Sequence, residues 1–397
     1  MEPAYLHVEV TTAQSARRPG DVCGDQVSVR RTARASTVIV CDGIGKGLKA
    51  NLAAGMLVSR LNELIERGVS LRRAFARCVE TTERYKSRGT TYAAFSVASV
   101  LPDGSATVLS YEAPAAITIS AHGEASSPAT RTESIGRALV HEATVRLGRG
   151  EGLLLLSDGV TQAGLGDARP RGWPSDEVAR FVERHRQSGL AVGEIPDAVH
   201  RQALQYWGDP SGDDVTACLL RLRPGRTLNL LTGPPTDKRQ DAAVVRRFLE
   251  WEGEKVVCGG TTAAVVARAS GRDVQIDRDS RDVLAPPASR IEGVDLVTEG
   301  AVTLNQVANL LDVAPEQLPD EGPVAQLVRR LLAADRIRIL AGLARNPAAG
   351  DVSLKQLGVL QRETIIERIA DQLRTQGKLV TVERCEAISL DKPFPRE

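Results

Sequence analysis

The segment TVIVCDGIGKG at positions 37–47 decides how the first half of this chain folds. Its short apolar run stops at Asp42-Gly43, which predicts a buried strand that presents a carboxylate at the edge of its sheet. Glycine beside the acid permits turn conformations closed to other residues and lets a backbone carbonyl approach an ion. The segment therefore predicts a strand followed by a turn that carries oxygen ligands.

The same pattern of strand and acidic turn recurs along the chain. Asp158-Gly159 follows an apolar strand-like run, Asp213 precedes one, and Asp25 precedes another. Mg²⁺ and Mn²⁺ take oxygen ligands and keep several waters, so a few carboxylates and a carbonyl suffice to bind them. Taken singly, each acid is better explained as an ordinary turn residue, because Asp-Gly is a common turn dipeptide. Taken together, the acids predict a carboxylate metal site.

The chain resembles the metal-dependent (type 2C) serine/threonine protein phosphatases, and most of all their SpoIIE-like branch, over about residues 1–222. The resemblance rests on the order and rough spacing of Asp25, the Asp42–Gly47 loop, Gly89-Thr90-Thr91, Ser157–Thr161 and Gly212–Thr216. It implies an α+β fold, in which helices flank a β-sandwich of two antiparallel sheets and two metal ions lie at one end of the sandwich.

The resemblance also implies roles for individual residues. Asp42 would bridge two divalent ions, Mn²⁺ or Mg²⁺, with the Gly43 carbonyl and Asp25 on one ion and Asp158 and Asp213 on the other. Asp42, Asp158 and Asp213 are then the catalytic residues of a phosphoserine or phosphothreonine protein phosphatase. A pair of such ions lowers the pKa of a bridging water that attacks phosphorus in line, so no side-chain nucleophile is needed.

Some positions depart from the pattern of that family. Ile44 stands where many members carry a histidine thought to protonate the leaving group, which leaves that proton to water or to another residue. Lys46 replaces a second histidine, and its ammonium group either binds phosphate as a point charge or is solvated. Residues 111–115 read Tyr-Glu-Ala-Pro-Ala where many bacterial members read Asn-Ala-Gly-His-Pro, which changes the geometry expected on the substrate side.

Composition limits the classes of function. The chain has 397 residues, enough for two or more domains, and its 51 Lys and Arg against 50 Asp and Glu give a net charge of +1. This balance predicts no nucleic-acid partner. The six cysteines form no C-x-x-C pair, which predicts a reducing cytoplasm. We expect no membrane association, because the sequence shows neither a leader-like start nor an apolar run of spanning length.

A different pattern begins after residues 223–226. Strand-like and helix-like runs alternate at residues 227–232, 237–251, 255–258 and 263–269. This predicts a small α/β domain of unknown role over residues 226–315. Residues 316–397 are expected to be mainly helical, either as a separate region or as part of the second domain. There we predict a helix over residues 324–343 and a strand over residues 379–382.

Gly259-Gly260-Thr261-Thr262 is the most chemically suggestive turn of this half. Free N–H groups at a helix start, together with two hydroxyls, are able to hold a phosphate. The turn is not a P-loop, because it lacks the lysine of that motif. The alternative, which is the commoner case, is a threonine N-cap after a tight glycine turn.

These patterns predict a cytoplasmic, bacterial-type phosphatase that acts on a regulatory phosphoprotein, such as an anti-sigma-factor antagonist, and carries a C-terminal sensing or partner-binding domain. The substrate rests on family analogy alone. One alternative is a phosphatase fold without activity, which Ile44 and Glu112 support and the retained acids oppose. The other is a protein whose nucleotide or phosphometabolite site lies in the C-terminal domain.

Overall fold

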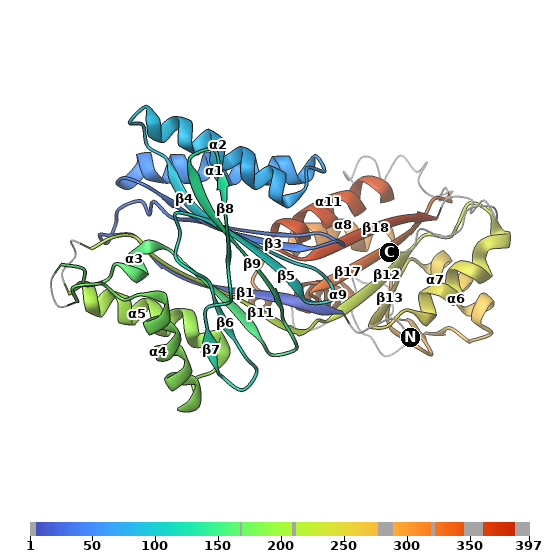
Figure 1. Ribbon diagram of the computed structural model, residues 1–397. Coiled ribbons are helices and arrows are strands. Elements are labelled where there is room, and N and C mark those ends of the chain that lie inside the picture. The colour runs from blue at the N-terminus through green and yellow to red at the C-terminus, as the bar shows by residue number, and fades with distance from the viewer. Residues whose placement is uncertain are drawn as a thin grey trace. The chain divides into compact units, whose positions relative to one another are not determined.

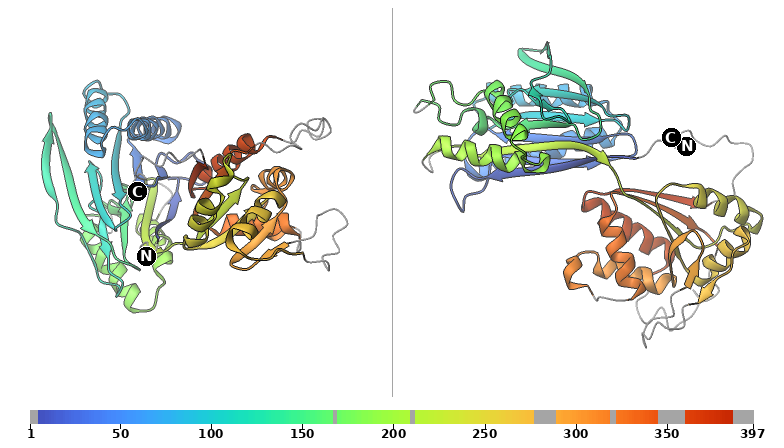
Figure 2. Two further views of the ribbon diagram at one scale, coloured as in Figure 1. Left: turned by 90° about the vertical axis from the view of Figure 1, so that its right-hand side faces the viewer. Right: turned by 90° about the horizontal axis from the view of Figure 1, so that it is seen from below.

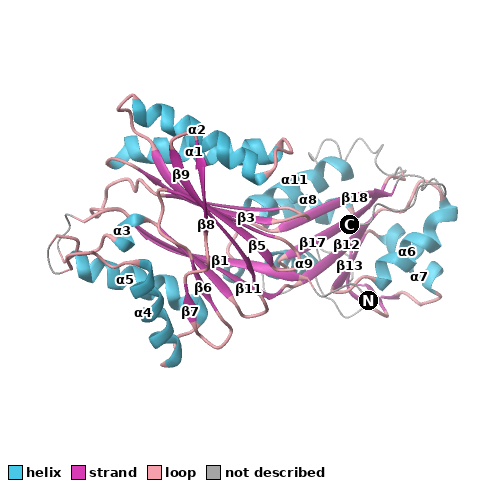
Figure 3. Ribbon diagram, viewed as in Figure 1, coloured by secondary structure: helices cyan, strands magenta, loops and turns pink. Residues whose placement is uncertain are grey.

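The computed structural model describes residues 5–166, 169–208, 212–276, 289–318, 322–344 and 360–385. These residues form two compact units that divide between Pro224 and Gly225, and Tyr5 belongs to the second unit. Helices and strands alternate with loops in both units (Figure 3). None of the helices in the described residues combines the length and the apolar character needed to cross a membrane.

The first unit is built on two antiparallel sheets (Figure 1). The five-stranded sheet contains, in order, β1 (Leu6–Ser15), β11 (Val215–Pro224), β10 (Gly152–Leu156), β6 (Ile117–Ile119) and β7 (Ala125–Ser126). The six-stranded sheet contains, in order, β2 (Gln26–Arg31), β3 (Ser36–Gly43), β4 (Ala93–Val100), β5 (Ser105–Tyr111), β9 (Ala138–Arg146) and β8 (Arg131–Ile135). Val40 and Leu155 share one buried cluster between the sheets, which makes the unit a sandwich.

Helices cover the outer face of each sheet (Figure 2). They are α1 (Gly47–Glu66), α2 (Leu71–Ser87), α3 (Asp158–Thr161), α4 (Ser175–Gln187) and α5 (Ile195–Trp207), with a 3₁₀ turn at Val192–Glu194. Leu61 of α1 and Phe75 of α2 pack with Ile39 of the six-stranded sheet. Val199 of α5 packs with Leu154 of the other sheet. The predicted helix-flanked sandwich is confirmed.

The second unit contains one mixed sheet of seven strands. In order across the sheet they are β14 (Gln275–Ile276), β15 (Ser289–Ile291), β16 (Val294–Thr298), β13 (Glu254–Cys258), β12 (Thr227–Thr232), β17 (Arg336–Gly342) and β18 (Leu379–Cys385). The strands from β16 to β18 run parallel, and β14 and β15 form an antiparallel edge. The chain moves outward from β12 in one direction and later from β17 in the other, so the winding reverses between these two strands.

Helices cover both faces of this sheet. They are α6 (Asp241–Glu250), α7 (Gly260–Ser270), α8 (Ala301–Leu310), α9 (Pro323–Ala333) and α11 (Arg362–Thr375), with 3₁₀ turns at Lys238–Gln240 and Pro315–Gln317. Leu230 lies in the buried cluster with α8, α9 and α11, and the next residue, Leu231, lies in the cluster with α6 and α7. Because successive strand residues point to opposite faces, both must be apolar in such a sheet. The predicted α/β architecture of the second half is confirmed.

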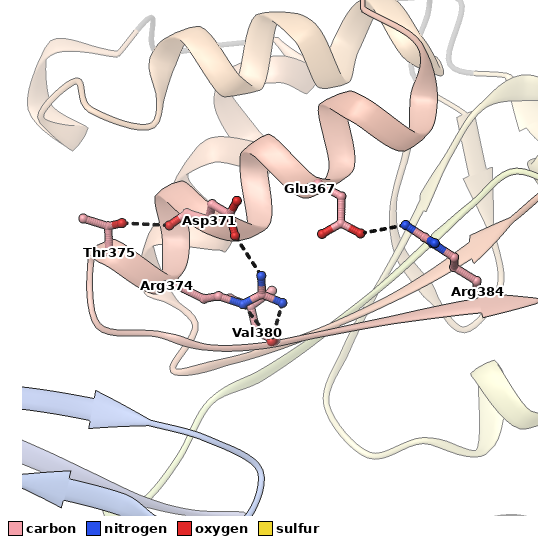
Figure 4. A network of polar contacts seen from close by, with 6 residues as sticks. All are labelled: Glu367, Asp371, Arg374, Thr375, Val380 and Arg384. Atoms are coloured by element: carbon pink, nitrogen blue, oxygen red, sulfur yellow. Dashed lines mark hydrogen bonds and ion pairs between the residues drawn. The ribbon is translucent and has the colours of Figure 1, made fainter. Parts of the chain in front are cut away.

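Polar contacts join α11 to the edge strand β18 (Figure 4). Arg374 donates to the Val380 carbonyl at 3.2 Å and to Asp371 Oδ1 at 2.9 Å, and Arg384 pairs with Glu367 at 3.1 Å. These pairs are largely solvent-exposed, so each contributes little to stability. The buried apolar face of α11 is therefore what holds the helix on the sheet.

The predicted helix over residues 324–343 is wrong. Helix α9 ends at Ala333, the backbone of Ala334 is extended with ψ 145°, and β17 begins at Arg336. Ile337 and Leu340, expected on one helical stripe, instead lie in the clusters on opposite faces of the sheet. A buried parallel strand is apolar on both faces, so its residues also fit a helical spacing. The strand predicted over residues 379–382 is confirmed within β18.

The predicted division of the second half into residues 226–315 and 316–397 stays a prediction. In the structure, strands from both ranges share one sheet, since β17 pairs with β12 on one side and with β18 on the other.

Candidate metal and phosphatase site

The fold brings the predicted acids to one end of the sandwich. Asp42 lies in the last two residues of β3, and Asp25 directly precedes the neighbouring strand β2. In the other sheet, Asp158 follows β10 and opens the short helix α3, and Asp213 lies just before the neighbouring strand β11. Adjacent antiparallel strands place the end of one beside the start of the next, which is why acids distant in sequence converge.

Asp25 links the two sheets and is itself incompletely satisfied. Its Oδ2 accepts a hydrogen bond of 2.6 Å from the Thr216 hydroxyl, and the Thr216 amide donates to Ser157 Oγ at 2.9 Å. The other oxygen, Oδ1, is buried and has no hydrogen-bond partner in the described part of the chain. Burial raises the pKa of Asp25, and the bond from Thr216 opposes that rise. Such an oxygen is costly to bury unless a further group satisfies it.

Asp42 lies among the other acids. Burial raises its pKa, and Asp25, Asp158 and Asp213 raise it further, with a hydrogen bond between Asp42 and Asp158 among the causes. Burial also raises the pKa of Asp213, while the charge of Arg17 lowers it. Carboxylates this close cannot all ionise without a compensating cation.

This set of side chains fits a hard divalent cation. Among the described residues, no three His, Cys, Asp or Glu side chains meet in the arrangement of a formed metal site. Even so, the acids lie close enough to act on one another's charge, and Asp25 keeps a buried oxygen without a partner. Metal ligands must be deprotonated, so a bound cation would replace the protons that such a cluster retains.

The glycines beside the acids are required by close backbone approaches. A Cβ on Gly43 would lie 2.0 Å from the Ala50 carbonyl oxygen in α1, and one on Gly159 would lie 1.9 Å from the Asp214 carbonyl oxygen. Neither position has room for a side chain. The Gly43 carbonyl oxygen lies 3.5 Å from the point where a Cβ on Gly24 would stand, which puts it beside the loop that carries Asp25.

Asp214 was not predicted as a site residue, yet it organises the site. It is buried, and its two carboxylate oxygens accept the amides of Arg17 and Gly24, each at 2.7 Å. The loop that ends at Asp25 is thereby held at both ends by one side chain. The Asp213-Asp214 doublet was the available signal, because neighbouring residues at a strand start point in opposite directions.

The departures from the family pattern surround the same acids. Ile44 donates its amide to the Tyr92 carbonyl at 2.8 Å, and Lys46 is exposed at the start of α1. Among the described residues, Glu112 is the non-glycine residue whose backbone is left-handed, with φ 52°. Its side chain pairs with Lys86. Asp42 and Asp158 line a small cavity together with Glu112 and Pro114. The substituted segment at residues 111–115 is thus next to the carboxylates.

The Gly259–Thr262 turn belongs to the second unit and stands at the carboxyl end of β13. Helix α7 begins at Gly260, Gly259 is its N-cap with φ 118°, and no side chain caps the helix. The alternative of a threonine N-cap is therefore wrong. Thr262 lies inside the helix, buried, and its hydroxyl oxygen accepts the Gly233 amide at 2.9 Å.

Residues 33–223 match the family described as stage II sporulation protein E (SpoIIE). This part of the chain is a SpoIIE-type phosphatase domain. The SpoIIE-type domain includes Asp42, Asp158 and Asp213, whereas Asp25 precedes the matched residues. No curated protein matches the chain.

Several solved structures are similar to parts of this chain. The RsbU and RsbW domains of Rv1364c from Mycobacterium tuberculosis share 17% identity, with 62% of this chain and 69% of that chain covered and a TM-score of 0.45. The SpoIIE phosphatase domain from Bacillus subtilis shares 19% identity over 56% and 95%, with a TM-score of 0.42. RsbX in complex with magnesium shares 18% over 55% and 99%, with a TM-score of 0.40. At these values we take nothing from them about activity or partners.

Proposed function

We propose that the chain is a metal-dependent phosphoserine or phosphothreonine protein phosphatase that acts on a bacterial regulatory phosphoprotein. The observation that carries this proposal is the carboxylate cluster, in which the buried Asp25 Oδ1 has no partner among the described residues and the half-buried Asp42 is surrounded by acids. A buried group with an unmet charge interaction is a functional-site candidate, because the fold alone gains nothing from it. The SpoIIE-type domain supplies the reaction class.

Asp25, Asp42, Asp158, Asp213 and the Gly43 carbonyl are the ligands that we assign to two divalent ions, Mn²⁺ or Mg²⁺. When bound, such ions supply an activated water and neutralise phosphoryl oxygens. The chain's own part is to hold these oxygens in place. Asp214 fixes the loop of Asp25, and Thr216 orients the Asp25 carboxylate by a hydrogen bond.

Lys46 is the candidate phosphate-binding residue of the SpoIIE-type domain. Its side chain is exposed at the start of α1, next to the Asp42-Gly43 turn. An ammonium group there would attract the substrate phosphate as a point charge. The same exposure also fits a solvated loop lysine, so Lys46→Ala distinguishes the two roles by whether the KM for a phosphopeptide rises.

The substrate class and compartment complete the proposal. We infer a phosphorylated regulator, such as an anti-sigma-factor antagonist, by analogy with the family. We infer the cytoplasm because all six cysteines are free thiols, as is usual in a reducing compartment. A C-terminal unit with its own sheet and cores supports a sensing or partner-binding role for residues 226–397.

Hydrolysis of p-nitrophenyl phosphate by the full chain tests the reaction class. The rates are compared with Mn²⁺, with Mg²⁺ and with chelator, for the wild type, for Asp42→Asn and for Asp176→Asn, an exposed acid in α4 that serves as the matched control. We expect metal-dependent turnover that Asp176→Asn retains and Asp42→Asn loses. Absence of turnover with either metal would instead favour a phosphatase fold without activity.

A second candidate function, a site for a nucleotide or phosphometabolite in the second unit, is favoured by topology. Gly259, Gly260, Thr261 and Thr262 follow β13, which neighbours β12, and the winding reverses on the other side of β12, between β12 and β17. Ligands of open α/β sheets bind outside the carboxyl ends of the strands at such a reversal. Arg362 lies at these ends, donating to the carbonyls of Gly342 and Ala344 at 3.1 and 3.2 Å.

A thermal-shift screen of the full chain with nucleotides and phosphorylated metabolites tests this second candidate. A ligand that binds only the native state raises Tm by mass action. At a ligand concentration one hundred times Kd, the unfolding free energy rises by about 2.7 kcal/mol. We expect Thr261→Val to reduce the shift, because Thr261 is exposed at the helix start and its hydroxyl is removed. No shift with any compound would remove the second candidate.

A further inference from the structure

A cavity of ≈ 500 Å³ opens beside Asp213 in the first unit. One wall is the loop of residues 15–21 after β1, and the other contains Leu204 and Trp207 at the end of α5. A space of this size accepts groups well beyond a single phosphate, since it falls in the range of ordinary ligand sites. The cavity therefore adjoins the candidate site and extends away from it.

The loop wall is built in advance of any ligand. Asp214 accepts the amides of Arg17 and Gly24, each at 2.7 Å, so both ends of the loop are tied to one buried carboxylate. Within it, residues 18–21 form a tight turn, in which the Asp21 amide donates to the Arg18 carbonyl at 3.1 Å and Gly20 has φ 88°. A Pro-Gly pair at the centre of a turn suits this conformation. A preformed wall lowers the ordering cost of binding.

This wall is cationic. Arg18 is exposed at the first position of the turn, and in the part of the chain that the structure describes no acid pairs with it. Arg17 also lines the cavity. Asp21 is the acid on the same loop. Exposed guanidinium groups of this kind recognise carboxylates.

The opposite wall is apolar and fixed. The Trp207 indole donates from Nε1 to the Gly159 carbonyl at 2.8 Å, so the ring is oriented by the same turn that follows Asp158. Leu204, one helical turn earlier on α5, is 42% exposed. A large aromatic ring held in one position offers contact area at little entropic cost. The cavity thus pairs an apolar wall with a cationic one.

We propose that this cavity binds the residues that flank the phosphorylated serine of the substrate, and that Arg18 selects an acidic residue there while Leu204 and Trp207 accept an apolar one. The proposal rests on the proposed phosphatase function and deepens it by naming the substrate class, a phosphoprotein whose phosphoserine lies in an acidic and apolar segment. Arg18 is a specificity residue in this account, with no role in the chemical step.

The test compares two phosphoserine peptides of equal length that differ only in the flank, Glu-Leu in one and Gln-Leu in the other. Kd is measured with the full chain in chelator by fluorescence anisotropy, where no turnover occurs, and kcat/KM is measured with Mn²⁺. The variants are Arg18→Glu, Arg18→Lys and Arg34→Glu, whose arginine is exposed in the turn between β2 and β3 at the far end of those strands from the acids.

We expect the wild type to prefer the acidic peptide about three- to fivefold in both measurements, since one exposed ion pair is worth at most about 1 kcal/mol. Arg18→Glu should reverse the preference, Arg18→Lys should keep most of it, and Arg34→Glu should leave it intact. Equal affinity for the two peptides, or a preference that survives Arg18→Glu, overturns the proposal.

The two readouts separate this proposal from the proposed function. A flank preference in Kd without any metal-dependent turnover would contradict the phosphatase assignment and still support the acidic-segment site. Metal-dependent turnover without a flank preference would support the phosphatase assignment and contradict the acidic-segment site.

Discussion

The two units of this protein bury acids in opposite ways. Asp241 of the second unit is buried at the start of α6 and, like Asp25, has a buried Oδ1 without a partner in the described residues, but its Oδ2 pairs with Arg268 at 2.7 Å. Asp25 of the first unit is also buried, but the charged neighbours that act on it are the acids Asp214 and Asp158. A buried acid beside a cation is explained by the fold. Buried acids beside one another call for a cation from outside, which is why the first unit carries the proposed chemistry.

The largest expected effect comes from Asp42→Asn. We expect it to lower metal-dependent turnover about a thousandfold, because the loss of a bridging ligand removes several kcal/mol of transition-state stabilisation. The unfolding free energy should stay level or rise, because the substitution relieves repulsion within the cluster. Isothermal titration with Mn²⁺ should show weakened binding. Undiminished binding and turnover in a folded variant would remove Asp42 from the site.

Divalent ions should stabilise the first unit, and more so at higher pH. Burial and neighbouring acids raise the pKa values of Asp25 and Asp42 above those of the unfolded chain. Without metal, these two groups stay protonated in the folded state at pH values where the unfolded chain has lost the protons. Their contribution to the unfolding free energy is therefore complete below about pH 4 and falls as the pH rises from there. Mn²⁺ replaces those protons, and should raise stability by about 2.7 kcal/mol at one hundred times Kd.

The measurement is Tm at pH 5 and pH 8, with Mn²⁺ and with chelator. Asp42→Asn should lose most of the pH dependence seen in chelator. In chelator, the unfolding transition of the first unit should not move to a higher Tm between pH 5 and pH 8. Such a rise would contradict the carboxylate cluster.

Thr216→Val should have an intermediate effect. It removes the 2.6 Å hydrogen bond that the Thr216 hydroxyl donates to Asp25 Oδ2 from the other sheet. A hydrogen bond to a charged group contributes about 1.5–3 kcal/mol. We expect Mn²⁺ affinity to fall about tenfold or more, measured by titration calorimetry. Thr12→Val, which removes a β1 hydroxyl that donates to Cys218 Sγ at 3.5 Å instead of to an acid, is the matched control.

Asp241→Asn should have a small effect on stability and none on turnover. Because the partner Arg268 is 66% exposed, the pair is screened by solvent, and we expect a loss of only about 1 kcal/mol in unfolding free energy. Phosphatase turnover should be unchanged. A denaturant titration and a turnover assay of the same preparation check both, and a large loss of turnover would mean that the buried acids of the two units are not distinct in role.

The smallest effect is expected at Glu112. Glu112→Gly removes the left-handed strain of a non-glycine residue and also the surface pair with Lys86. Since these changes oppose each other, we expect Tm to rise by a few degrees at most, for a gain below about 1 kcal/mol. Glu112→Ala loses the pair and keeps the strain, so it should be less stable than Glu112→Gly. The reverse order would contradict this account of the turn.

Local sequence was sufficient for the strands that end in Asp42 and Asp158, because an apolar run followed by Asp-Gly specifies both the strand and its stop. It was insufficient for Asp214 and Thr216, whose partners Gly24 and Asp25 lie far away in the sequence. Roles of that kind depend on the pairing of sheets, which no local pattern records.

The same limit explains the errors in the second half. Residues 324–343 fit one helical stripe, yet they divide between α9 and β17, because a strand buried on both faces has no alternation to distinguish it. At residues 259–262 the N-cap is Gly259 and not a threonine, since Thr262 instead accepts a backbone amide from the loop after β12. In both places a tertiary contact overrides the local preference.

Turnover of a phosphoserine peptide by the full chain, as free Mn²⁺ is raised from a chelated start, tests the central claim most directly. The acids around Asp42 predict no turnover in chelator, a saturating rise with Mn²⁺, and loss of that rise in Asp42→Asn. Turnover that persists in chelator, or a rise that Asp42→Asn retains, would contradict the assignment of these acids to a metal-dependent phosphatase site.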